Sequence, residues 1–70
     1  MKMEFVKQAL DEWGEIIIQT SSGQSFELHT GDTTFDTDQR VIQFTASNAK
    51  FFIDGDSVEI LKMHFSHAGE

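Results

Sequence analysis

The sequence contains neither cysteine nor proline, and its 5 basic residues are outnumbered by 12 acidic ones. Without cysteine the chain forms no disulfide and no thiolate metal site, and a reducing compartment is compatible with it. Without proline every strand keeps its full set of backbone donors. The formal net charge of −7 opposes binding to anionic membranes and nonspecific binding to nucleic acid, whose affinity comes mainly from neutralised phosphates. The same charge is typical of a surface that keeps a small protein in solution.

No apolar run is long enough to cross a bilayer, and the first residues lack the apolar core of a secretion signal. We therefore expect a cytoplasmic protein with no membrane partner. Seventy residues form one domain, whose apolar burial barely exceeds the conformational entropy lost on folding. Because disulfides are excluded, and no metal or other cofactor is predicted, oligomerisation is the remaining means of stabilisation.

Residues 3–13 have the spacing of an amphipathic helix. Its predicted apolar stripe consists of Met3, Phe5, Val6, Ala9, Leu10 and Trp13. Gly14 follows as a helix stop. No good N-cap residue precedes the helix, and Asp11 and Glu12 lie unfavourably at the negative end of its dipole. The helix is therefore expected to need support from the rest of the fold.

Short β-branched and aromatic segments separated by turn residues predict five strands. They cover residues 15–20, 24–30, 40–45, 51–53 and 58–65. Gly31 and Asp32 interrupt the second strand as a bend or bulge would, with 33–35 as its continuation. Residues 46–49 form a turn. This order predicts a mostly β fold, in which a helix precedes a strongly bent antiparallel sheet that closes into a small barrel. SH3-like and OB-like barrels both fit the pattern.

Residues 53–61 are interpreted as strand, tight turn and strand, with Asp54-Gly55 as a turn that needs a positive φ. The strand after the turn is apolar on both faces. Val58 and Ile60 are assigned to one face, and Leu61, Met63 and Phe65 to the other. A strand in a small one-sheet protein has one wet face. The second dry face therefore predicts cover by another copy of the chain.

Two patterns resemble the motifs of the Sm and LSm proteins, a family that includes the bacterial protein Hfq. They are Ile16-x-Ile18-x-Thr20-x-x-Gly23-x-x-Phe26-x-Leu28 with Phe35-Asp36 after it, and Ile53-x-Gly55-x-x-Val58-x-x-Leu61. The resemblance covers nearly the whole chain. It implies a single Sm-like domain over residues 1–70, with a helix at about 3–13 and a barrel at about 15–66. It also implies a homo-oligomeric ring of about five to seven copies and single-stranded RNA as a partner.

The resemblance places the RNA-binding site in two loops. Its predicted residues are Phe35, Asp36, Gln39, Arg40, Asp54, Gly55 and Asp56. Arg40 stands where the family has an asparagine, and Asp54 where it has an arginine, so the loops have exchanged charge. The glycine usual in the second strand of the family is missing, and Glu27-Leu28 stand at that point. The Lys-His pair of Hfq has no counterpart beside Asp54.

Two functions fit this altered site. The first is a ring that binds RNA through a modified, acidic site. The second is an Sm-like or SH3-like interaction or scaffolding module without nucleic-acid binding. We expect Arg40 to form a hydrogen-bonded pair with a nearby aspartate, which would occupy the arginine and leave the opening net acidic, so that RNA binding through it is poor.

Two further groups contain side chains of types that bind metals. The carboxylates of the two loops, Asp36, Asp38, Asp54 and Asp56, suit a hard cation, but their sequences are ordinary turns. His29, His64 and His67 have no metal-site spacing and are interpreted as surface or pore-lining residues. No nucleophile has a base nearby, and there is no glycine-rich phosphate loop, so no catalytic residues and no enzymatic activity are predicted.

Overall fold

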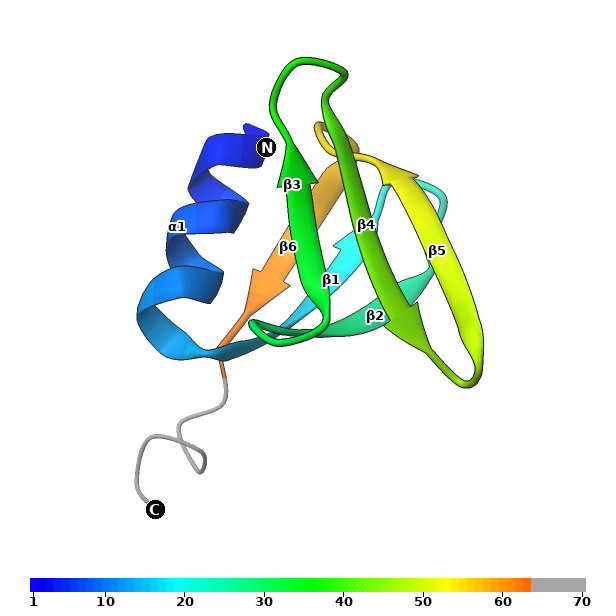
Figure 1. The fold of residues 1–70 in the computed structure, drawn as a ribbon. Helices are drawn as coiled ribbons and strands as arrows, with labels where there is room; N and C mark the ends of the chain where they lie inside the picture. Colours follow the sequence, from blue (N-terminus) through cyan, green and yellow to red (C-terminus); the bar gives the residue numbers. More distant parts are fainter. Residues whose placement is uncertain (64–70) are drawn as a thin grey trace.

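The computed structural model of the chain describes residues 1–63, which form one helix and six strands in two sheets (Figure 1). The elements are α1 (Met3–Trp13), β1 (Glu15–Thr20), β2 (Ser25–His29), β3 (Thr33–Asp36), β4 (Val41–Ala46), β5 (Ala49–Asp54) and β6 (Val58–Lys62). The strand orders are β2-β1-β6 and β3-β4-β5, and every pairing is antiparallel. No helix within residues 1–63 has the length and apolar character needed to cross a membrane.

The mostly β class with a leading helix is confirmed, but the sheet is divided where a single bent sheet was expected. The interruption at Gly31-Asp32 is a complete break, so that Thr33–Asp36 is a separate strand in the other sheet. Backbone hydrogen bonds fix this crossing, from Asp32 N to His29 O at 3.0 Å and from Thr45 N to Asp32 O at 3.3 Å. The two three-stranded sheets do not close into a barrel within the described part of the chain.

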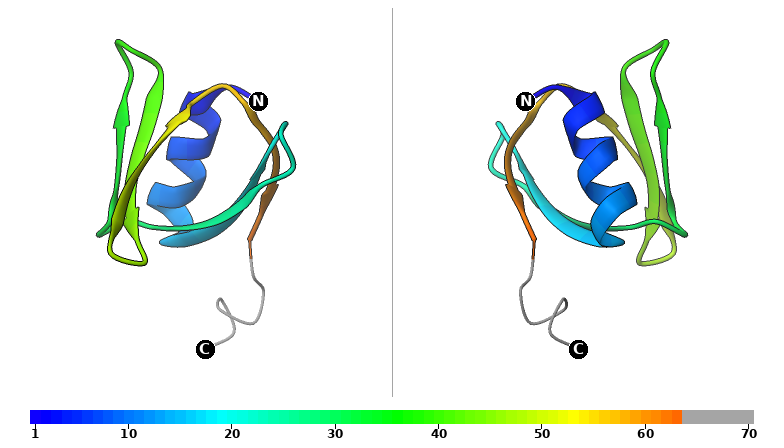
Figure 2. Two further views of the ribbon diagram at one scale, coloured as in Figure 1. Left: turned by 90° about the vertical axis from the view of Figure 1, so that its right-hand side faces the viewer. Right: turned by 90° about the vertical axis from the view of Figure 1, so that its left-hand side faces the viewer.

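The helix has the predicted bounds and ends at Gly14, whose φ of 91° is left-handed and whose N–H donates to Leu10 O at 2.7 Å. It packs against β1 and β6, and it covers one side of the space between the two sheets (Figure 2). Its buried residues are Met3, Val6, Ala9 and Leu10. Phe5 was predicted to widen this stripe but is 56% exposed, because it lies outside the face that contacts the strands.

The core lies between the sheets and the helix. Its buried members are Met3, Val6, Leu10, Ile16, Ile18, Leu28, Ile42, Phe44 and Val58. The predicted shared face of Ile42 and Phe44 is confirmed, since both are buried in β4. The turn at 46–49 is also confirmed. Ser47 and Asn48 have φ values of 51° and 63°, as expected for a two-residue hairpin turn.

A β-bulge in β6 overturns the predicted faces of that strand. Gln19 pairs with Ile60 and Thr20 pairs with Val58, so Glu59 is an extra residue opposite β1. Val58 is consequently buried, whereas Ile60 is 49% exposed and points away from the core. Leu61 and Met63 pack against the core, and Phe65 lies outside the described residues. Among the described residues of this strand, Ile60 is therefore the apolar side chain left on the face away from the core.

Gly55 is required for a different reason from the one predicted. Gly55 does not have the predicted positive φ, since the glycines with positive φ among residues 1–63 are Gly14 and Gly23. The strands on either side of it, β5 and β6, belong to different sheets and so do not form the predicted hairpin. Gly55 is buried, and its N–H donates to Arg40 O at 2.7 Å. A Cβ at this position would lie 2.8 Å from Met3 Cγ and 2.9 Å from Arg40 O. The glycine therefore permits the close approach of the helix to two loops.

We predict that Gly55→Ala lowers the free energy of unfolding by about 1–3 kcal/mol, because the added methyl group overlaps a backbone oxygen and a buried side chain. Urea denaturation measures the loss. Gly31→Ala is the matched control, since a Cβ there meets nothing within 4 Å. Equal stabilities for the two variants would contradict this account of Gly55.

Candidate functional site

Three segments meet at one end of the sheet formed by β3, β4 and β5. Val41 pairs with both Asp36 and Asp54, so the β3–β4 loop and the β5–β6 connection leave the sheet side by side. The first turn of α1 lies against them through Met3. The two loops predicted to form the site are therefore adjacent, and the helix N-terminus is a third component that the sequence interpretation did not include.

Arg40 is the centre of this cluster. Its φ of 61° is left-handed, which is uncommon for a residue with a side chain. Its Nε and Nη2 donate to the two carboxylate oxygens of Asp56, at 3.0 and 2.6 Å. Its Nη1 and Nη2 donate to the two oxygens of Glu4, the Nη2 bond being 3.0 Å long. One guanidinium group thus forms bidentate contacts with two carboxylates.

Asp56 also supplies the helix cap that the sequence lacks. Its Oδ1 accepts a hydrogen bond from Met3 N at 3.1 Å, while Lys2 at the N-cap position provides no side-chain cap. Glu4 lies in the first turn, where a negative charge is favourable to the helix dipole. The expected support for the helix therefore comes from the same carboxylates that bind Arg40.

The hydrogen bonds from Arg40 hold the pKa of both carboxyl groups well below the usual range. The pKa of Glu4 falls from 4.5 to about 2, mainly through the Arg40 hydrogen bonds and then through a backbone N–H. The pKa of Asp56 falls from 3.8 to about 2, mainly through Arg40 and then through Met3 N–H. The same contacts raise the pKa of Arg40. All three groups are charged at neutral pH.

The remaining predicted site residues have structural contacts of their own. Asp36 Oδ1 accepts the N–H groups of Asp38 and Gln39, both at 3.0 Å, and shapes the β3–β4 loop. Asp54 Oδ1 accepts Asp56 N–H at 3.0 Å and shapes the β5–β6 turn in the same way. Phe35, which is half-buried, packs against the core. Gln39 is exposed.

The expected pair of Arg40 with a nearby aspartate is present, and Glu4 is a second partner that was not expected. Arg40 pairs with Asp56 and Glu4, whereas Asp54 is used in its own turn. Glu4 was missed because nothing in the sequence indicates that residues 4 and 40 approach each other. The sequence does place Glu4 in the first helical turn, where a carboxylate is favourable, but it does not indicate which cation the carboxylate meets.

Potential metal ligands gather elsewhere in the fold. Within the described range, the group of three close ligand atoms consists of Glu15, Glu27 and His29, on the paired strands β1 and β2. His29 Nδ1 lies 4.0 Å from Glu15 Oε1, and His29 Nε2 lies 3.6 Å from Glu27 Oε1. The four loop aspartates form no such group there. His64 and His67 lie outside the described residues.

We predict that acid weakens the fold through the Arg40 cluster. A carboxylate whose pKa is lowered in the folded state stabilises the protein above its unfolded pKa, and this contribution disappears as pH falls. For Glu4 and Asp56 the loss should occur as pH falls from about 4.5 to about 2. Urea denaturation at stepped pH measures it.

Glu4→Gln should flatten the decline in stability over this pH range. Asp38→Asn, which removes one carboxylate from the neighbouring loop, is the control and should leave the decline unchanged. An identical acid profile for Glu4→Gln and the unmodified chain would show that the pairing contributes nothing.

Comparisons of the chain with protein-family models, with curated proteins and with solved structures found no match. The two loops and the helix N-terminus, with Arg40 held between Glu4 and Asp56, form the candidate site.

Proposed function

We propose that this chain is a cytoplasmic protein-interaction or scaffolding module that assembles with copies of itself and does not bind nucleic acid. The observation that supports the proposal is the engagement of Arg40 by Glu4 and Asp56. Arg40 is the one basic residue in the loops where the Sm resemblance implies contact with RNA. Its donors point at carboxylates of the same chain rather than outward.

For Arg40 to bind a phosphate, its ion pairs with Glu4 and Asp56 would have to break. Each phosphate contact depends on a cation that replaces condensed counterions, and the Arg40 cluster carries one cation against two carboxylates. Asp36 and Asp54 lie at the same end of the sheet and add further negative charge. An RNA backbone approaching this end would meet a net negative field. A basic protein surface, by contrast, would meet a field of complementary sign at this end.

Free strand edges and exposed apolar side chains support self-assembly. The two strand orders leave β5 and β6 each with one unpaired edge among residues 1–63. Phe52 on β5 is 62% exposed and Ile60 on β6 is 49% exposed. An unpaired edge is a template for pairing with another chain. Pairing of β5 in one copy with β6 in the next, around a closed ring of about five to seven copies by the Sm resemblance, would cover these two edges.

The RNA-binding ring is the competing function, and fluorescence anisotropy with short U-rich and A-rich RNAs separates the two. We predict no tight binding by the unmodified chain at physiological salt. Asp54→Arg restores the residue usual in Sm proteins and should raise the affinity, with a marked loss as salt increases. Asp38→Asn is the control, because it removes one negative charge without adding a cation. Tight binding by the unmodified chain that is lost in Arg40→Ala would overturn the proposal.

We also predict that the chain sediments as a closed oligomer at micromolar concentration. Phe52→Lys and Ile60→Lys should each dissociate it, because both place a charge on an apolar surface that the proposed assembly would cover. Phe5→Lys changes a helix residue that is also more than half exposed and should leave the oligomer intact. Circular dichroism checks that all three variants are folded. A stable monomer of the unmodified chain in sedimentation equilibrium would reject self-assembly.

A further inference from the structure

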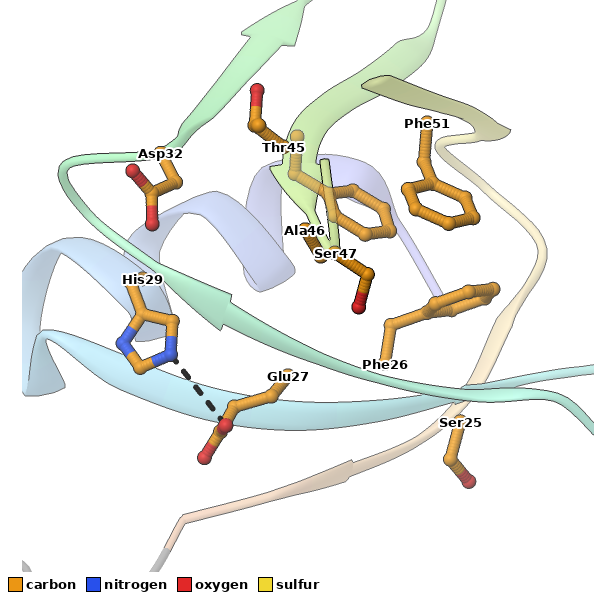
Figure 3. A pocket seen from close by; sticks show the side chains of 10 residues that line it. Ser25, Phe26, Glu27, His29, Asp32, Thr45, Ala46, Ser47 and Phe51 are labelled. Carbon is orange, nitrogen blue, oxygen red and sulfur yellow. Dashed lines mark ion pairs between the residues drawn. The ribbon is translucent and has the colours of Figure 1, made fainter. Parts of the chain in front are cut away.

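A pocket of about 400 Å³ lies between β2 and the hairpin formed by β4 and β5 (Figure 3). It is separate from the Arg40 cluster, because neither of the two site loops contributes to its lining. Its volume is within the range of known ligand sites. Among residues 1–63 β2 is the edge strand of its sheet on this side, so within this range the pocket lies beside an unpaired strand edge.

One end of the pocket is aromatic. The rings of Phe44 and Phe51 stack with centroids 5.1 Å apart, and Phe26 meets Phe44 edge-on at 5.2 Å. Phe44 is buried, whereas Phe26 and Phe51 are half-buried and keep ring surface at the pocket wall. Such a wall suits an aliphatic chain, and the ring faces attract a cation.

The other end is polar and carries negative charge. Glu27, His29 and Asp32 line it, and Figure 3 shows them opposite the labelled Phe26 and Phe51. His29 Nε2 lies 3.6 Å from Glu27 Oε1. No lysine or arginine is among the lining residues, and the chain carries a formal net charge of −7. The pocket therefore joins an apolar wall to a carboxylate rim.

We infer that this pocket binds a lysine or arginine side chain from an extended segment of a partner protein. The inference rests on the proposed interaction function and names the chemistry of its partner. The aliphatic stem lies against Phe26 and Phe51, and the cationic head group donates to Asp32 at the polar end. The unpaired edge of β2 favours an extended chain over a free small cation, since it offers backbone groups to a further strand.

The test uses acetylated, amidated heptapeptides of alanine and valine with one variable central residue. Amide chemical shifts report where each peptide binds. Central lysine and arginine should both bind and should shift the amides of Phe26, Thr45 and Phe51. Norleucine, which keeps the stem and removes the charge, should bind at least about tenfold more weakly, as should glutamate.

Asp32→Asn should weaken the lysine peptide about tenfold. Glu59→Asn is the control, since it removes one exposed charge from β6, outside the pocket. An equal loss in both variants, shifts spread over the acidic surface, or equal binding of the norleucine peptide would each overturn the inference. Asp32→Asn should leave sedimentation and the RNA assay unchanged. Failure of the proposed function in those two assays is therefore distinguishable from failure of the pocket.

Discussion

The contact on which the structure depends is the double pairing of Arg40. It joins the β3–β4 loop to the β5–β6 connection through Asp56 and to the helix through Glu4. Isolated surface ion pairs contribute little, because each must immobilise two long side chains in water. Here one planar guanidinium group serves two carboxylates, and Asp56 is fixed further by Met3 N–H. The geometry makes the cluster a structural clamp and directs the guanidinium donors of Arg40 to carboxylates of its own chain.

The sequence predicted features that depend on local chemistry. The helix bounds, its stop at Gly14 and the turn at 46–49 follow from periodicity and turn residues, and all three are present. The faces of β6 were wrong because alternation assumes that no residue is inserted, and the bulge at Glu59 is specified by the partner strand β1. The break at Gly31-Asp32 was recognised as an interruption. Its assignment to two sheets depends on long-range pairing that local patterns do not contain.

In the candidate site, too, local sequence predicted some features, and others depended on long-range contacts. An arginine among several aspartates predicted a paired Arg40, because such a group rarely stays without a carboxylate partner. The identity of the partners required the fold, since Glu4 is 36 residues away in the sequence. Gly55 is instructive in another way. A glycine in an Asp-Gly pair usually indicates a positive φ, yet here it is needed because Met3 and the Arg40 carbonyl leave no room for a side chain.

The capping of α1 by Asp56 has a consequence for how the chain folds. The bond from Met3 N to Asp56 spans 53 residues, so the first turn of the helix is complete only when both ends of the described chain have met. Closing so long a loop costs entropy before the bond is gained, which slows folding relative to a helix capped by its own sequence. The helix terminus should therefore be among the last parts to become ordered. A force that pulls the N-terminus away would act first on the bond from Met1 N to Val58 O and next on the bond from Met3 N to Asp56.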